Sequence, residues 1–196
     1  MTRDMRLPLI LTLAAVLPLR ADLPEAAQKL VTAARSQIGV TTLYDGAYVK
    51  LAYPGGDVPA ERGVCTDVLV RAFRTKGLDL QKLVHEDMAG AFAKYPQKWG
   101  LKSPDANIDH RRVPNLMRFF ERAGKKIAVT KNPADYQPGD IVSCIIPGNL
   151  AHIMLVCDTP SPDDPKRFQI IHNIGAGARM EDRLFDFEIT GHFRYW

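Results

Sequence analysis

The 196-residue sequence has few cysteines and lacks the short motifs of common metal sites. It holds three cysteines and five histidines, with no CxxC pair and no HExxH segment. Such closely spaced pairs are typical of zinc sites. Cys65, His152, His172 and His192 are suitable ligand types, but their spacing specifies nothing. We therefore expect no metal and no cofactor, and keep a zinc-binding protein as the weakest alternative.

Segments typical of nucleic-acid binding or membrane insertion are also missing. No stripe of Lys and Arg is interleaved with aromatic residues, so we expect no nucleic-acid partner. The apolar run Leu7–Leu19 is shorter than the about 20 residues that a membrane helix needs. Hydrophobic residues make up 46% and charged residues 24%, which is ordinary for a globular protein with a real core.

The N-terminus has the layout of a secretory signal. Arg3 and Arg6 precede the apolar run, and Ala21 is a small residue at a possible cleavage point. We expect a signal peptide at residues 1–21, one domain at residues 22–196, a periplasmic location and no stable membrane span after cleavage. A buried N-terminal helix or an uncleaved anchor is the alternative. Half of the formal net charge of +4 falls in the expected signal, so the remainder is only weakly basic.

An odd number of cysteines leaves at least one of them free or paired between chains. Cys144 and Cys157 lie in apolar runs that predict two strands of a hairpin around the segment PGNLA. Such a turn places Cys144 opposite about Met154, too far from Cys157 for a disulfide. We therefore expect both to be small core residues, and Cys65 to stand apart from them.

The period of the apolar residues changes along the chain from helical to alternating, which favours an α+β fold with N-terminal helices packed on an antiparallel sheet of about five strands. No internal repeat or second domain is indicated. Helices are expected at residues 22–39, 65–76, 80–94 and 115–123, and strands at 126–130, 140–146, 152–157, 168–172 and 187–195.

Cys65 begins the second predicted helix, with Val68, Leu69, Ala72 and Phe73 on its inward face. A thiol at a helix N-terminus has a lowered pKa, and the free N–H groups there can hold an oxyanion. The position therefore suits covalent acyl chemistry, although a small buried cysteine would look the same in the sequence.

Two histidines supply the imidazole that such chemistry needs. His152 begins one predicted strand and His172 ends the next, so an antiparallel pairing brings them to the same end of the sheet. A cysteine nucleophile needs one imidazole as base and a third group to orient it. Asn173 is a rival for the third position, but its side chain should face the other side of its strand, and we favour His172.

Further polar residues are candidates for substrate binding. Asp67 adds a carboxylate in the first turn beside Cys65, which opposes a low thiol pKa and could instead grip an amino group. His110, Arg111 and Arg112 could bind a carboxylate from a loop, unless that loop is solvated with Asp109 paired to an arginine. The glycine-rich segment 175–179 predicts a flexible rim loop.

These features together resemble the NlpC/p60 superfamily of papain-like cell-wall peptidases. The resemblance spans roughly residues 24–195 and depends on the order and spacing of Cys65-Thr66-Asp67, Pro138-Gly139-Asp140, His152-Ile153-Met154 and Ile171-His172. The segments RGVCTDVLVRAFR, NIDHRRVPNL, PGDIV and HNIG look like an exported bacterial family described only as a domain of unknown function, DUF 1287.

The NlpC/p60 resemblance implies a papain-like core in which Cys65 is the nucleophile, His152 the base and His172 the orienting residue. An upstream tyrosine shapes the site in that superfamily, and Tyr53 or Tyr44 could match it. Val64 and Asp67 depart from the superfamily's Asp directly before the cysteine and Gly two residues after it.

The function expected from these residues is a cysteine amidase or endopeptidase that hydrolyses amide bonds, with peptidoglycan peptides as the substrate. Acyl transfer by the same thiol is a variant that the sequence does not separate from hydrolysis. A noncatalytic module that binds the cell envelope is the main alternative.

Overall fold

A computed structural model describes residues 23–196, and the expected signal peptide lies outside these residues. Four α-helices and three short 3₁₀ helices are described. The α-helices are α1 (Glu25–Arg35), α2 (Cys65–Arg74), α3 (Leu80–Ala91) and α4 (Val113–Arg122), and the 3₁₀ helices are η1 (Phe92–Lys94), η2 (Asp109–Arg111) and η3 (Pro133–Asp135).

The strands form a two-stranded parallel pair and a six-stranded antiparallel sheet. The parallel pair is β1 (Leu43–Tyr44) with β2 (Arg62–Gly63). The large sheet has the order β3-β8-β4-β5-β6-β7. Its strands are β3 (Lys126–Ile127), β4 (Ile141–Ile146), β5 (Leu150–Pro160), β6 (Phe168–Asn173), β7 (Ala178–Glu181) and β8 (Glu188–Phe193).

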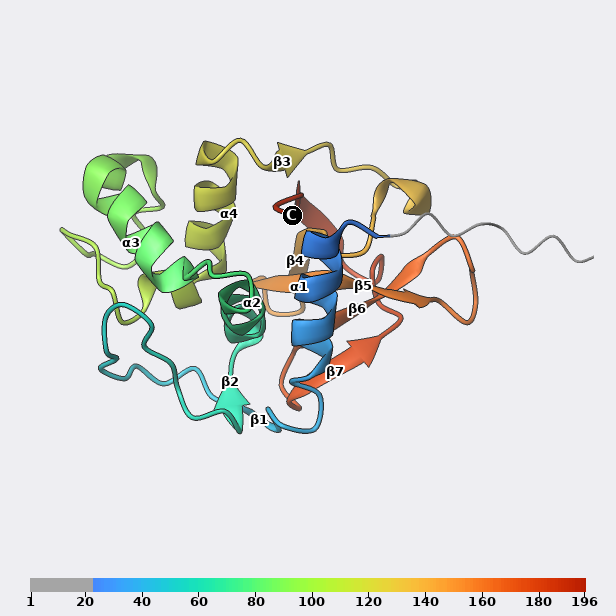
Figure 1. The fold of residues 1–196 in the computed structure, drawn as a ribbon. Coiled ribbons are helices and arrows are strands. Elements are labelled where there is room, and N and C mark those ends of the chain that lie inside the picture. The colour runs from blue at the N-terminus through green and yellow to red at the C-terminus, as the bar shows by residue number, and fades with distance from the viewer. Residues whose placement is uncertain (1–22) are drawn as a thin grey trace, which may run out of the picture.

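Helices α1, α2 and α4 lie against one face of the large sheet, and α3 packs on α2 and α4. Helix α1 contacts α2 and β5, while α2 contacts β5 and β6 and α4 contacts β5 and β8. Figure 1 shows α2, α3 and α4 grouped to one side and α1 crossing in front of the strands. A large apolar core fills the space between the two layers, with Leu69 and Phe73 from α2 meeting Ile153 and Leu155 from β5. The expected α+β fold is therefore confirmed.

The opposite face of the sheet carries a second, smaller core. Alternate residues of the same strands, among them Cys144, Met154 and Val156, pack there against Tyr136 and Leu184. Successive side chains of a strand point to opposite faces, so His152 lies on this second face while Ile153 lies on the helix face. This alternation determines on which face of the sheet the side chain of each candidate catalytic residue lies.

Local signals in the sequence locate most helix ends. Asp79 caps α3 by accepting the N–H of Gln81 at 3.1 Å, as its position predicts. Gly77 and Gly124 follow α2 and α4 in the left-handed conformation that favours glycine, with φ of 73° and 68°. Helix α1 is shorter than expected and follows Pro24, because the carbonyl oxygen of that residue accepts the first N–H groups of the helix.

The β4–β5 hairpin differs from the predicted register. Its strands pair up to Ile146 and Leu150, and the turn between them holds only three residues, with Gly148 and Asn149 at positive φ. The tighter turn places Cys144 opposite His152 instead of Met154. All three cysteines are free and buried. No helix among residues 23–196 is long and apolar enough to cross a membrane.

The predicted rim loop at residues 175–179 is confirmed only in its first part, because residues 174–177 form a bend while Ala178 and Arg179 already belong to strand β7. A Cβ on Gly177 would lie 2.5 Å from the carbonyl oxygen of Thr41, so only glycine fits this approach. The N–H of Ala178 donates to the same carbonyl oxygen at 2.7 Å. The turn delivers a sixth strand whose last residue is Glu181.

Candidate active site

Cys65 is the first residue of α2, as the sequence predicts. Val64 before it is extended, and its N–H donates to the carboxylate of Asp67 at 2.7 Å. This bond fixes the entry of the chain into the helix and holds Cys65 where the unpaired N–H groups of the first turn gather.

Asp67 is also one half of a buried ion pair. Its carboxylate accepts from Arg111 Nε and Nη2, both at 3.0 Å, and the two side chains are 3% and 2% exposed. Arg111 further donates to the carbonyl oxygens of Ala47 and Asp45 at 3.0 and 2.9 Å. Asp67 and Arg111 were expected to contact substrate. In the structure they pair with each other instead, because either charge alone would be costly to bury.

The Cys65 sulfur lies at an interruption of the sheet. The ladder between β5 and β6 ends at Leu155 and Ile171, although β6 continues to pair with β7 as far as Asn173. The Val156 N–H bonds on the β4 side, so the N–H of Ile153, three residues earlier, points to the β6 side. Hydrogen bonding from the Ile153 N–H acts on the Cys65 thiol. The sulfur thus takes the place that the β6 backbone leaves, which we call the strand gap.

His152 and His172 meet across the strand gap, as their positions in the sequence predict. His152 Nε2 lies 2.8 Å from His172 Nδ1, and His172 Nε2 lies 2.6 Å from Glu181 Oε2. The two rings are edge to face, and both are almost fully buried. Cysteine and imidazoles therefore approach the gap from opposite faces of the sheet, and no hydrogen bond joins Cys65 to His152 among residues 23–196.

Burial keeps both the thiol and the imidazole neutral. It raises the pKa of Cys65 to about 11; the Ile153 N–H lowers this pKa and the Asp67 carboxylate raises it. Burial, with His172 and Arg183, lowers the pKa of His152 to about 3. The expected fall of the thiol pKa at the helix start is therefore outweighed by desolvation, while the opposing effect of Asp67 is confirmed.

An open pocket with a volume of about 230 Å³ leads to Cys65. Its wall combines the loop at 44–46, the start of α2, and the segments around η2 and α4. The lining residues are Tyr44, Gly46, Val64, Cys65, Trp99, Ile108, Arg111, Arg112, Val113, Pro114 and Ala151. Tyr44 is half-exposed here, and burial is the main cause that raises its pKa.

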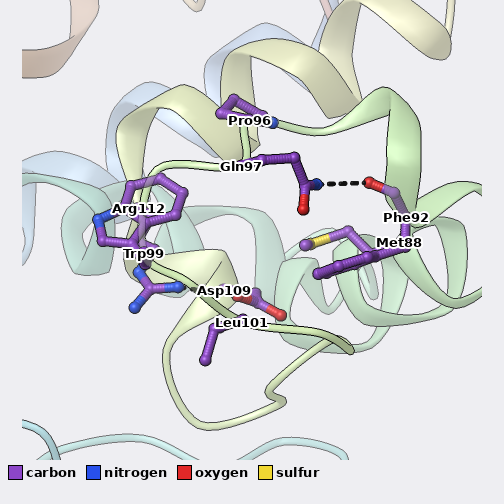
Figure 2. Close-up of a pocket in the computed structure, with 8 residues that line it drawn as sticks. All are labelled: Met88, Phe92, Pro96, Gln97, Trp99, Leu101, Asp109 and Arg112. Atoms are coloured by element: carbon purple, nitrogen blue, oxygen red, sulfur yellow. Dashed lines mark hydrogen bonds and ion pairs between the residues drawn. The ribbon is translucent and has the colours of Figure 1, made fainter.

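Arg112 and Trp99 form one side of this pocket. The Arg112 guanidinium lies 4.1 Å from the centre of the Trp99 ring, and its Nη1 lies 3.4 Å from Asp109 Oδ1. Figure 2 shows Arg112, Trp99 and Asp109 beside a neighbouring small pocket. Gln97 and Phe92 also line that pocket. The pairing of Asp109 with an arginine agrees with the alternative expected from the sequence, although Asp109 is buried.

The remaining candidates lie away from the sulfur or serve the fold. His110 is 2% exposed, its Nδ1 has no partner in the described part of the chain, and burial lowers its pKa to about 4. Tyr53 packs edge-on against His85 and does not line the pocket, so of the two tyrosines Tyr44 lies nearer the candidate site. Asn173 donates to the Gly63 carbonyl oxygen at 3.0 Å and faces the helix side, as predicted.

Sequence reasoning missed Glu181 and Trp99. Glu181 follows a glycine-rich turn, and its diagonal position relative to His172 depends on the register of β6 and β7, which no short motif encodes. Trp99 lies in a polar loop, and the presence of a tryptophan in such a segment was the available signal. No group of three or more His, Cys, Asp or Glu side chains within residues 23–196 is arranged to hold a metal ion.

Comparison with known proteins identifies the family. Residues 31–195 match the family model described as "Domain of unknown function (DUF1287)". The chain is 60% identical over 163 residues to "Uncharacterized protein YijF" of Escherichia coli (strain K12). The aligned residues cover 83% of this chain and 78% of that protein. No solved structure matches. The chain belongs to the DUF1287 family, as the sequence segments indicate.

Proposed function

We propose that this member of the DUF1287 family is a cysteine hydrolase that cleaves amide bonds, with Cys65 as nucleophile, His152 as base and His172 as the residue that orients the base. One observation carries the proposal: the Ile153 N–H acts on the Cys65 sulfur at the start of α2, and His152, the residue before Ile153, is joined to His172 by a 2.8 Å hydrogen bond. The resemblance to papain-like NlpC/p60 peptidases adds support from the order of the same residues.

The reaction begins from neutral groups. His152 Nδ1 takes the thiol proton as the sulfur attacks the substrate carbonyl carbon, and the C–S bond forms. The oxyanion accepts hydrogen bonds from N–H groups at the start of α2, where those of Cys65 and Thr66 already act on the sulfur. His152 then gives its proton to the amide nitrogen, the C–N bond breaks, and the amine leaves an acyl-enzyme.

Water completes the cycle. It attacks the acyl carbonyl while His152 takes one of its protons. The C–S bond then breaks, His152 returns that proton to the sulfur, and a carboxylic acid leaves the regenerated thiol. Because thiol and imidazole are neutral at rest, the base works during the attack, without a preformed ion pair. Hydrogen bonds of this kind often tighten only when substrate is bound.

The pocket favours a peptide substrate with a carboxylate. Arg112 is 18% exposed in its side chain, lines the same pocket as Cys65, and has its guanidinium over the Trp99 ring. A guanidinium held in this way presents a pair of donors to a carboxylate. Peptidoglycan peptides carry free carboxylates beside amide bonds, so we propose them as the substrate class, with Tyr44 as a further part of the pocket wall.

Export to the periplasm is part of the proposal, because peptidoglycan lies outside the inner membrane. It depends on the signal-like sequence of residues 1–21.

A noncatalytic envelope-binding module is the second candidate. The observation that favours it is the raised pKa of Cys65, about 11, which leaves little thiolate at neutral pH. Such a module would use the same pocket and the same Arg112, but it would not need the sulfur.

The test compares Cys65→Ala with Cys157→Ala, a second buried cysteine whose sulfur contacts Thr159 on another part of β5. Each protein is incubated with purified peptidoglycan and with soluble muropeptides, and new amines and carboxylates are counted by mass spectrometry. We expect cleavage by the wild type and Cys157→Ala only. Binding that survives Cys65→Ala, without cleavage by any of the three proteins, would favour the binding module.

A further inference from the structure

Glu181 stands at the outer end of the hydrogen-bonded chain that begins at His152. It is the last residue of β7, and its backbone lies opposite Ile170, two residues along β6 from His172. Its side chain is 30% exposed, whereas that of His172 is 1% exposed. The carboxylate therefore touches solvent on one side and a buried imidazole on the other.

The hydrogen bonds determine where the protons lie. A carboxylate oxygen can only accept, so His172 Nε2, at 2.6 Å from Glu181 Oε2, must carry a hydrogen and donate it. A neutral imidazole has a single N–H, so His172 Nδ1 is then an acceptor. His152 Nε2, at 2.8 Å from it, must in turn donate. The hydrogen of His152 is thus on Nε2, and its Nδ1 is left with a free lone pair.

The surroundings keep both rings neutral. Burial lowers the pKa of His172, while the bond to Glu181 raises it and Arg183 lowers it again. Arg183 acts in the same direction on His152, and Cys144 of β4 stands opposite His152 in the ladder. Because neither ring is charged, each carries one N–H. The donors therefore run in one direction, from His152 to His172 and from His172 to Glu181.

We propose that Glu181 is a positioning residue that fixes the tautomers of His172 and His152, so that His152 Nδ1 is the basic atom offered to the thiol. The inference rests on the proposed function for the role of that lone pair, but the tautomers themselves do not depend on it. Without Glu181, His172 would be free to carry its hydrogen on Nδ1, and His152 Nε2 would then have to accept.

The experiment reads the tautomers directly, by two-dimensional nitrogen NMR of protein labelled with ¹⁵N-histidine. Signals are assigned with His152→Gln and His172→Gln. In the wild type we expect both rings to be protonated at Nε2. Glu181→Leu removes the acceptor and should give a mixture or the reverse tautomer, whereas Glu181→Gln retains an oxygen and should keep most of the original one. Glu188→Leu, an exposed glutamate on β8, is the matched control and should change nothing.

A second readout connects the tautomer to the thiol. The rate at which p-nitrophenyl acetate acylates Cys65 at pH 7 should fall at least about tenfold in Glu181→Leu, because the base then presents its lone pair to the wrong neighbour. Glu181→Gln should lose less, and Glu188→Leu nothing.

The outcomes separate the inference from the proposed function. A wild-type His152 protonated at Nδ1, or tautomers that stay the same in Glu181→Leu, would overturn the inference even if Cys65 cleaves amides. Full amide cleavage by Cys65→Ala would overturn the proposed function and leave the tautomer assignment standing.

Discussion

The carboxylate of Asp67 and the guanidinium of Arg111 form an ion pair that is almost completely buried, with the arginine donating to Asp67 through two nitrogens. The pair lies directly behind the nucleophile, since Asp67 also accepts the N–H of Val64, the residue before Cys65. The ion pair therefore connects the helix start and η2, and through Arg111 also the loop at 45–47.

Replacing one partner of this pair should be costly. Arg111→Leu leaves the Asp67 charge buried without compensation and should lower the free energy of unfolding in urea by about 3–5 kcal/mol. Asp67→Asn combined with Arg111→Leu should cost less than the sum of the two single changes, because no charge is then left alone. Lys82→Ala, which breaks the exposed pair with Glu86, is the control and should cost under about 0.5 kcal/mol. Strict additivity would contradict the coupling.

The reactivity of Cys65 should follow a high thiol pKa. In a protein with Cys144→Ala and Cys157→Ala, the rate of alkylation by iodoacetamide should climb from pH 7 upward, with a midpoint near 11. The same protein unfolded in urea should show the ordinary midpoint of about 8.5. A rate that is already maximal near neutral pH would mean a preformed thiolate–imidazolium pair and would contradict the neutral resting state.

His110 should make the fold sensitive to acid. Burial lowers its pKa in the folded state to about 4, against a usual value of 6.5, so the folded state favours the neutral ring. This contribution to stability is complete above pH 6.5 and is lost as the pH falls toward 4, because the unfolded chain takes up the proton first.

The measurement is the free energy of unfolding in urea between pH 7.5 and 4. His110→Leu should reduce its slope by up to about 1.4 kcal/mol per pH unit over the acidic part of this range. The offset at pH 7.5 separates any change in packing from the titration. An unchanged slope would mean that His110 is already accessible to protons in the folded protein.

Gly177→Ala should destabilise the turn that leads into β7. The new Cβ would lie 2.5 Å from the Thr41 carbonyl oxygen, and φ at this position is 83°. We expect a loss of more than about 1 kcal/mol in thermal or urea unfolding. Gly90→Ala in α3, where a Cβ meets nothing within 4 Å, is the matched control and should stabilise the protein by up to about 1 kcal/mol. Equal effects would show that the turn relaxes freely.

Much of the fold follows from local patterns in the sequence. The start of α2 at Cys65, the Asp79 cap, and the glycines after the helices are all encoded within a few residues of where they act. The meeting of His152 with His172 was also predictable, because it needs only that two adjacent strands are antiparallel.

The errors concern contacts between distant segments. The ion pair of Asp67 and Arg111 joins residues 44 positions apart. In the sequence, each charged residue by itself was therefore interpreted as a substrate-binding group. Glu181 and β7 were hidden because the glycines before them suggested a loop, whereas the close approach to Thr41 is what requires Gly177. The thiol pKa was misjudged because the helix start is visible in the sequence and the depth of burial is not.

The reach of Arg111 also has a consequence for how the protein folds. Its guanidinium contacts Asp67 and Asp45, which lie 44 and 66 residues earlier, so the helix start that carries Cys65 acquires its full set of partners only after long loops have closed. Loop closure of this kind is slow compared with helix formation, because its entropy is lost before the contact is gained. An isolated peptide of residues 61–77 would therefore have the sequence of the nucleophile's helix without its site, and a nascent chain would complete that site only once η2 has been synthesised.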